Sequence, residues 1–205
     1  MKLYGFPPSP NTRKVQAVIE ALEMPVEFQV VDLGKGEQRK PEYLALNPTG
    51  RAPTLVDGDF VLWESNAIMQ YLASRRPNSL WPDDRKTQAD INRWLCWQLG
   101  HWNEGTGRLI FQRLVKPLLK IGEPDAAEIK RGDELFRRDA AVLDNWLARR
   151  EYLVGSGVTL ADFAVAAPLM HVSPAQLPVE NYPNLMAWYA RIEAEPGWKK
   201  SQPQM

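Results

Sequence analysis

The chain has 205 residues, with 25 basic and 25 acidic side chains and a formal net charge of zero. This balance argues against nucleic acid as a partner, because nucleic-acid-binding proteins usually carry a basic face. Hydrophobic residues make up 44% of the chain, enough for a packed core, and no apolar run approaches the ~18 residues that span a bilayer. The single cysteine excludes an internal disulfide, and the first ten residues lack a signal-peptide pattern, so we expect a soluble cytoplasmic protein without a membrane partner.

The first third of the chain predicts alternating strands and helices. Residues 3–6 predict a short strand, and apolar residues between Val15 and Leu22 recur at the spacing of one helical face. Pro25 ends this helix, and alternation over residues 26–30 predicts a second strand. A strand–helix–strand unit of this kind places its two strands parallel to each other.

The next segment predicts a second helix and a hairpin. Residues 41–46 predict a short helix, which the sequence NPTG at residues 47–50 ends. The dipeptide Asp57-Gly58 between two apolar runs is typical of a β-hairpin, and Ser65-Asn66 would begin the helix after it. The resulting order, β-α-β-α-β-β-α, predicts a small α/β domain over residues 1–77.

The rest of the chain predicts only helices. A proline-rich linker at residues 78–86 precedes an all-helical domain at residues 87–205. Thr159 and Asp162 have the spacing of a capping box, with Asp in place of the usual Glu. Cys96 lies in a tryptophan-rich stretch, where we expect a buried thiol. Three stripes at helical spacing support the domain: Ile91/Trp94/Leu95/Gln98/Leu99/Trp102, Phe136/Ala140/Leu143/Leu147 and Leu185/Trp188/Tyr189/Ile192.

Four motifs occur in a characteristic order: SPNTR at residues 9–13, NPTGRAPTL at 47–55, WESNAI at 63–68 and TLADF at 159–163. With these motifs the chain resembles the cytosolic glutathione S-transferase family over nearly its whole length. The resemblance implies a thioredoxin-like N-terminal domain followed by an all-helical C-terminal domain, and a homodimer. It also implies glutathione as co-substrate, with no tightly bound cofactor and no metal.

The resemblance assigns the glutathione site to the second and third motifs. It implies a cis Ala52-Pro53 bond and an Ala52 backbone that pairs with the extended cysteinyl part of glutathione. Glu64 and Ser65, at the start of a helix, would receive the ammonium and the carboxylate of the γ-glutamyl end. An ordinary turn proline and a simple helix cap are the alternative interpretations of these residues.

The glycyl carboxylate of glutathione needs a cation or a donor, for which Arg51 and Arg39 are the candidates. The family often has a His-Lys pair where this chain has Gln38-Arg39, so the contact is open between the two arginines. Arg51 is preferred because it adjoins Pro53, and a solvated basic residue is the alternative interpretation of Arg39.

Ser9 stands where serine-type members of the family hold the serine that activates the thiol. A free thiol has a pKa of about 8.5, so a mostly ionised thiol at neutral pH needs a fall of ~2 units, or about 2.7 kcal/mol. A helix dipole supplies ~0.3–1 kcal/mol and a hydrogen bond to a charged acceptor ~1.5–3 kcal/mol, so the two together suffice. Asn11 is the rival donor, since Ser-Pro-Asn also resembles the Thr-Pro-Asn of nu-class members, which are often disulfide reductases.

We therefore expect a glutathione transferase that directs the thiolate at a small apolar electrophile. Trp102 and Arg108, from the helical domain, are candidates for the electrophile pocket. A glutathione-dependent disulfide or peroxide reductase, and a binding module without turnover, are the alternatives. A thioredoxin-type enzyme would need a cysteine near Ser9, where the sequence has none.

Overall fold

The structure is a computed structural model, and it describes residues 1–203. The chain divides into two compact units: the first contains Met1–Pro82 and the C-terminal segment from Ala194, and the second contains Asp83–Glu193. The boundaries predicted from the sequence assign this C-terminal segment to the helical domain. Contacts group it with the first unit instead, because helix α10 (Pro196–Lys200) packs on helix α1 (Pro10–Ala21).

The first unit contains a four-stranded sheet in the order β2-β1-β3-β4. Its strands are β1 (Lys2–Gly5), β2 (Glu27–Val30), β3 (Thr54–Asp57) and β4 (Phe60–Trp63). Strand β1 is parallel to β2 and antiparallel to β3, and β3 is antiparallel to β4. The predicted hairpin is present, with the two residues Gly58 and Asp59 between the paired residues Asp57 and Phe60.

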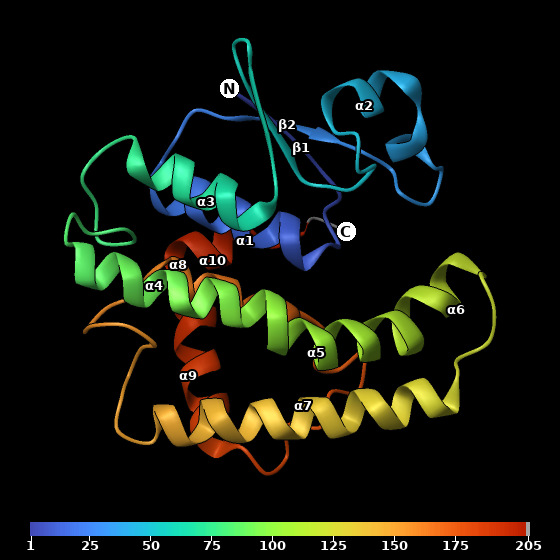
Figure 1. The fold of residues 1–205 in the computed structure, drawn as a ribbon, viewed down its shortest axis with the longest axis vertical. Helices are drawn as coiled ribbons and strands as arrows, with labels where there is room; N and C mark the ends of the chain where they lie inside the picture. Colours follow the sequence, from blue (N-terminus) through green and yellow to red (C-terminus); the bar gives the residue numbers. More distant parts are fainter. Residues whose placement is uncertain (204–205) are drawn as a thin grey trace. The chain divides into compact units, whose positions relative to one another are not determined.

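Helices cover both faces of this sheet. Besides α1 and α10, the first unit contains the helices η1 (Glu37–Arg39), α2 (Pro41–Leu46) and α3 (Ser65–Ser74). Helices α1 and α3 pack together (Figure 1), and Leu3 and Leu55 of the sheet have no exposed surface. Tyr4 alternates with Leu3 and so points to the other face, where its ring meets Tyr43 of α2 edge-on at a centroid distance of 6.3 Å. The predicted thioredoxin-like order of strands and helices is confirmed.

The second unit is entirely helical, as predicted. Its elements are α4 (Arg85–Trp97), η2 (Gln98–Trp102), α5 (Asn103–Ile110), η3 (Phe111–Val115), α6 (Lys116–Leu119), α7 (Ala126–Leu147), α8 (Leu160–Ala166), η4 (Ala167–His171) and α9 (Pro183–Ala194), which ends at the first residue of the C-terminal segment. The residues of the three predicted stripes are buried except Leu99, which is 49% exposed because Gln98 and Trp102 occupy the buried side of η2. Thr159 donates to Asp162 through both its backbone N–H and its hydroxyl, each at 2.9 Å, so the predicted capping box is present.

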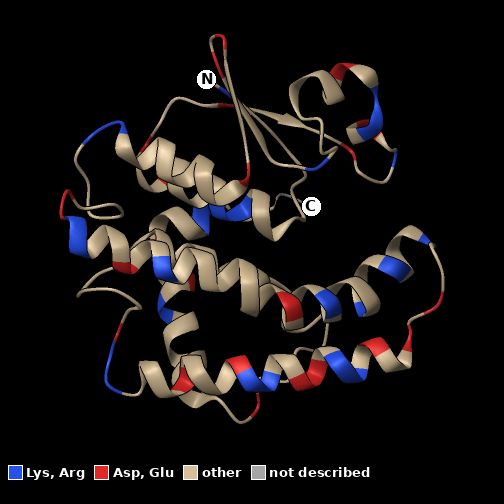
Figure 2. Ribbon diagram, viewed as in Figure 1, with Lys and Arg blue, Asp and Glu red and all other residues tan. Residues whose placement is uncertain are grey.

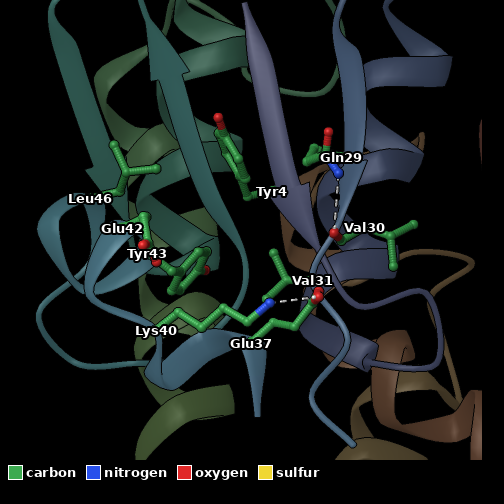
Figure 3. A pocket seen from close by; sticks show the side chains of 9 residues that line it. All are labelled: Tyr4, Gln29, Val30, Val31, Glu37, Lys40, Glu42, Tyr43 and Leu46. Atoms are coloured by element: carbon green, nitrogen blue, oxygen red, sulfur yellow. Dashed lines mark hydrogen bonds and ion pairs between the residues drawn. The ribbon is translucent and has the colours of Figure 1, made fainter. Parts of the chain in front are cut away.

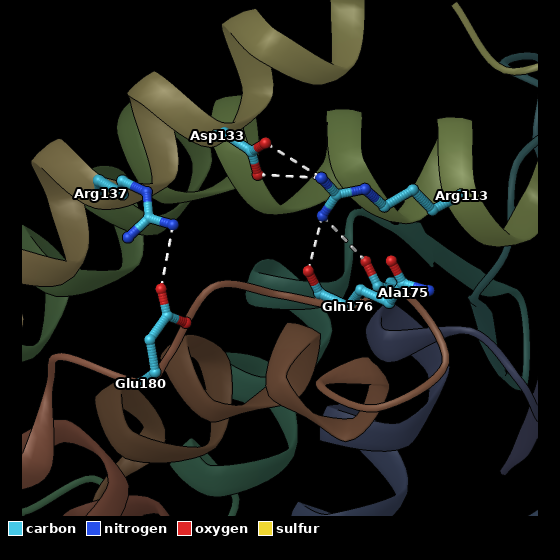
Figure 4. Close-up of polar contacts among 6 residues, drawn as sticks. All are labelled: Arg113, Asp133, Arg137, Ala175, Gln176 and Glu180. Atoms are coloured by element: carbon cyan, nitrogen blue, oxygen red, sulfur yellow. Dashed lines mark hydrogen bonds and ion pairs between the residues drawn. The ribbon is translucent and has the colours of Figure 1, made fainter. Parts of the chain in front are cut away.

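Polar contacts join separate segments of the helical unit (Figure 4). Arg113 donates to both carboxylate oxygens of Asp133 on α7 and to the carbonyl of Gln176 at 2.6 Å. Arg137 of α7 pairs with Glu180 at 3.0 Å. Basic and acidic residues alternate along α7 (Figure 2), in keeping with the balanced charge of the chain.

One local expectation is wrong. Cys96 is exposed rather than buried, because Trp94 and Leu95 occupy the apolar side of α4 at that point. Within residues 1–203, no helix combines the length and the apolar character that crossing a bilayer requires.

Candidate functional site

The turn from β1 to α1 fixes the position of Ser9. Ser9 precedes the helix as its N-cap residue, in an extended backbone conformation, and Pro10 occupies the first helical position. Its N–H donates to the carbonyl of Phe6 at 2.9 Å, and the N–H of Phe6 donates to the hydroxyl of Thr12 at 3.1 Å. The Ser9 side chain is half-buried and makes no capping hydrogen bond, so its hydroxyl can donate to another group. Asn11 lies inside the helix and is not its cap.

A small polar pocket of about 60 Å³ lies in the first unit. Six residues predicted for the site line it, together with two that the prediction missed, Asn47 and Thr49. The full lining is Asn11, Asn47, Thr49, Arg51, Ala52, Pro53, Glu64 and Ser65. Residues far apart in the sequence thus meet at one place. Ser9 and Arg39 were also predicted, and they are not among the residues that line this pocket.

Asn47 organises one wall of the pocket, although it has almost no exposed surface. Its amide donates to the carbonyl of Arg51 at 2.8 Å and to the hydroxyl of Thr54 at 3.0 Å. Its side-chain oxygen accepts from the N–H of Thr49 at 3.0 Å and from the Thr49 hydroxyl at 2.7 Å. This is an Asx turn, and the Asn-Pro-Thr-Gly sequence that the prediction took only as a chain break is its signal.

Helix α3 begins at the opposite wall. Ser65, the first residue of α3, is 6% exposed, and its hydroxyl donates to Oδ1 of Asn11 at 3.3 Å. The exposed Glu64 before it has φ 73° and ψ 110°, a conformation that costs a residue other than glycine about 1–3 kcal/mol. Strained backbone conformations of this kind cluster at ligand sites, so the conformation of Glu64 indicates a binding position at the start of α3. The Ala52-Pro53 bond is cis, as the resemblance implied.

The two candidate arginines flank the loop at residues 47–50. Both are exposed, and Arg51 lines the pocket. The Nη1 atom of Arg39 lies 3.3 Å from the position that a side chain on Gly50 would occupy, so its guanidinium lies against this loop. Either cation is therefore free to approach an anion near the pocket.

A buried lysine, which the prediction also missed, lies on α1 beside the start of α3. Lys14 of α1 has no exposed surface, and its ammonium donates to Oδ1 of Asn66 at 2.7 Å. Burial lowers the pKa of Lys14 to about 7, against the opposing effect of the negative charge of Glu64. The sequence signal for its burial was its position four residues before Val18, on the apolar stripe of the helix.

A larger cavity of about 400 Å³ opens on the other face of the sheet (Figure 3). Tyr4, Val30, Lys40 and Tyr43 are among its lining residues, and none of the predicted site residues is. Lys40 pairs with Glu37 at 3.2 Å across its rim. Size alone does not make it the site, because Lys40 and Glu37 pair with each other and the Tyr43 hydroxyl is bonded to Arg51 and Thr54, outside the lining.

In the helical unit, one of the two electrophile-pocket candidates is corrected. Trp102 has no exposed surface: its indole N–H donates to the carbonyl of Val165 at 3.0 Å and its ring packs on Phe136. It is a core residue of that unit, with no surface left for a ligand. Arg108 is partly exposed and pairs with Glu128 of α7.

The arrangement of the first unit suits an anionic peptide-like ligand. It offers exposed cations, an acidic side chain, the first turn of α3 and a backbone segment at Ala52 that is part of the pocket lining. Within residues 1–203, no three His, Cys, Asp or Glu side chains gather in a way that would hold a metal ion.

Comparisons with known proteins place these features in a family. Residues 1–74 match the family model described as Glutathione S-transferase, N-terminal domain, and residues 106–196 match Glutathione S-transferase, C-terminal domain. Glutathione S-transferase 3 of Zea mays is 39% identical over 98% of this chain and 92% of its own length. The crystal structure of glutathione transferase F7 from Populus trichocarpa superposes with a TM-score of 0.89 at 29% identity, over 98% of this chain and 96% of that one. Glutathione transferase URE2P8 from Phanerochaete chrysosporium, solved with oxidized glutathione, has a TM-score of 0.84 at 28% identity, over 98% and 92% of the two chains.

Proposed function

The chain belongs to the glutathione S-transferase family and is a glutathione transferase, and from this premise we propose that Ser9 stabilises the thiolate of a glutathione bound to the first unit. The observation that carries the proposal is the state of Ser9. It is half-buried at the positive end of α1, and its hydroxyl is not used to cap that helix. A hydroxyl and a helix dipole together supply the free energy that thiol ionisation requires.

The remaining groups of the tripeptide find complementary partners around the small pocket. We assign the γ-glutamyl carboxylate to the first turn of α3 at Ser65, and its ammonium to Glu64. The backbone of Ala52 pairs with the cysteinyl residue as a short added strand. The glycyl carboxylate takes Arg51, with Arg39 as the alternative. A pocket of about 60 Å³ holds one end group of the tripeptide, and the rest lies along the adjoining surface.

The thiolate then attacks a small apolar electrophile. The nucleophile belongs to glutathione, so the protein contributes ionisation, orientation and exclusion of water. Arg108 remains the candidate from the helical unit for contact with the electrophile. We further propose a cytoplasmic homodimer, for which the exposed aromatic side chains of Phe60 and Trp63 on β4 provide apolar surface.

A second candidate function rests on Asn11. Asn11 lines the pocket whereas Ser9 does not, and its side-chain oxygen is already taken by the Ser65 hydroxyl. Its amide N–H groups are then the donors available to a thiolate. A thiolate held by Asn11 would suit glutathione-dependent reduction of disulfides or peroxides.

Two variants separate these possibilities. Ser9→Ala removes the proposed donor and should lower the rate of conjugation of an aryl halide about tenfold to a hundredfold, while glutathione still binds. Asn11→Ala should have the smaller effect. The opposite ranking, combined with faster turnover of a mixed disulfide than of the aryl halide in the wild type, would favour the Asn11 reductase.

A further inference from the structure

Lys14 is the most deeply buried charged group near the glutathione pocket, and the proposed mechanism does not use it. It has no exposed surface and lies on the apolar stripe of α1, beside Val15 and Val18, which are also fully buried. A buried ammonium is costly unless polar groups compensate it. Its hydrogen bond to Asn66 at 2.7 Å provides part of that compensation.

This hydrogen bond joins α1 to the start of α3, which forms one wall of the pocket. Asn66 follows Ser65 in the first turn of α3, and Ser65 itself donates to Asn11 of α1 at 3.3 Å. Asn11 and Lys14 are three residues apart and so project from the same side of α1. The start of α3 is therefore attached to α1 at two adjacent residues, Ser65 and Asn66, which directly follow the strained residue Glu64.

Groups of both signs lie near Lys14. The first turn of α3 carries a partial positive charge, which disfavours a cation beside it. Glu64 is the acidic group whose charge favours the ammonium, and Glu64 is itself exposed to solvent. The other charged residues on elements that pack against α1 are exposed or engaged elsewhere: Lys199 and Lys200 of α10, and Lys2 of β1, which pairs with Glu27. Arg13, the residue before Lys14 on α1, lies over the ring of Trp198 at 4.3 Å from its centroid.

We propose that Lys14 is a positioning residue for glutathione: its buried ammonium holds the Glu64–Asn66 segment in its binding conformation and is the internal counter-charge for the γ-glutamyl carboxylate. This inference rests on the proposed function of the pocket. It adds a cation that does not touch the ligand, and it makes binding depend on the charge state of a buried group.

A linkage between binding and protonation follows. Because burial lowers the pKa of Lys14 to about 7, its side chain is only partly protonated in the free protein near neutral pH. A carboxylate bound at Ser65 favours the charged form, so Lys14 takes up a proton as the ligand binds. Uptake is a fraction of a proton per site near neutral pH, and affinity falls as the pH rises above the pKa of free Lys14, by up to tenfold per pH unit.

Titration calorimetry with S-methylglutathione tests this linkage, because the methyl group removes the thiol proton from the balance. Binding heats in buffers of different ionisation enthalpy give the protons taken up per site, from pH 6 to pH 8.5. The wild type should take up protons near pH 7.5. Lys14→Arg retains the charge at every pH, so it should bind with similar affinity but without uptake and without the fall above pH 7. Lys14→Met should lose both the uptake and at least tenfold in affinity.

Each outcome decides a separate point. Wild-type binding without proton uptake, or uptake that persists in Lys14→Arg, overturns the role of Lys14 and leaves the proposed function intact. No binding of S-methylglutathione to the wild type overturns the proposed function itself. If Lys14→Met does not fold, the comparison of the wild type with Lys14→Arg still gives the answer.

Discussion

Removal of the Asn47 side chain is the sharpest mutational test of the pocket wall. Asn47→Ala deletes four hydrogen bonds in one step, two that its amide donates and two that its oxygen accepts. The two acceptors, the carbonyl of Arg51 and the hydroxyl of Thr54, keep a contact to the Tyr43 hydroxyl at 2.7 and 2.9 Å. The two donors on Thr49 are part-buried, so water can replace Asn47 there.

The magnitude follows from this count. Because neither acceptor loses its last partner, each donated bond costs only its net value of about 0.5–1.5 kcal/mol. The two hydrogen bonds to Thr49 add little to this loss, because water replaces Asn47 there. We therefore expect a loss of about 2 kcal/mol in the free energy of unfolding, or roughly 4–8 °C in Tm for a chain of this size. The loop that carries Arg51 loses its anchor, so the Kd for glutathione should rise about tenfold.

Urea unfolding and glutathione titration should be measured together, with Asn78→Ala as the control. Asn78 is half-buried and donates to the carbonyls of Ala73 at 2.6 Å and Arg76 at 2.7 Å, but it does not line the pocket. It should lose comparable stability while its glutathione affinity stays at the wild-type value. If Asn47→Ala loses stability yet binds glutathione as the wild type does, glutathione binds elsewhere. An unchanged urea midpoint would refute the hydrogen-bond argument.

Two further expectations concern packing and charge. A side chain on Gly105 would lie 2.6 Å from the backbone N of Phe136, so Gly105→Ala should lower the free energy of unfolding by about 1–3 kcal/mol. A side chain on Gly107 would meet nothing within 4 Å, so Gly107→Ala should raise the free energy of unfolding by up to about 1 kcal/mol in the same urea experiment. Arg51→Ala should raise the Kd for glutathione about tenfold to a hundredfold and spare the affinity for a γ-glutamyl-cysteine dipeptide, which lacks the glycyl carboxylate. If Arg39→Ala shows this selectivity and Arg51→Ala does not, the contact belongs to Arg39.

The fold could be predicted from the sequence because its local signals agree with one another. Apolar periodicity, the prolines at element ends and the Asp57-Gly58 turn signal each point to the order of strands and helices that the structure has. The capping box at Thr159 and Asp162 was predictable for the same reason, since both of its members lie within one helical turn.

The site was only partly predictable, because long-range contacts decide it. Asn47 and Thr49 gave a turn signal, but their place in the pocket depends on partners at Arg51 and Thr54 that only folding brings together. Lys14 joins Asn66 across 52 residues, which no local pattern encodes. Periodicity placed Trp102 on a helix but could not tell its core face from a ligand-facing one.

The ionisation of bound glutathione tests the central claim most directly. Ultraviolet absorbance of the thiolate, followed against pH in the complex, gives the thiol pKa in the wild type and in Ser9→Ala. The wild type should titrate near pH 6.5, about 2 units below the free thiol, and Ser9→Ala should return most of the way to about 8.5. A wild-type complex that titrates like free glutathione, or a Ser9→Ala complex that titrates like the wild type, would contradict the role assigned to Ser9.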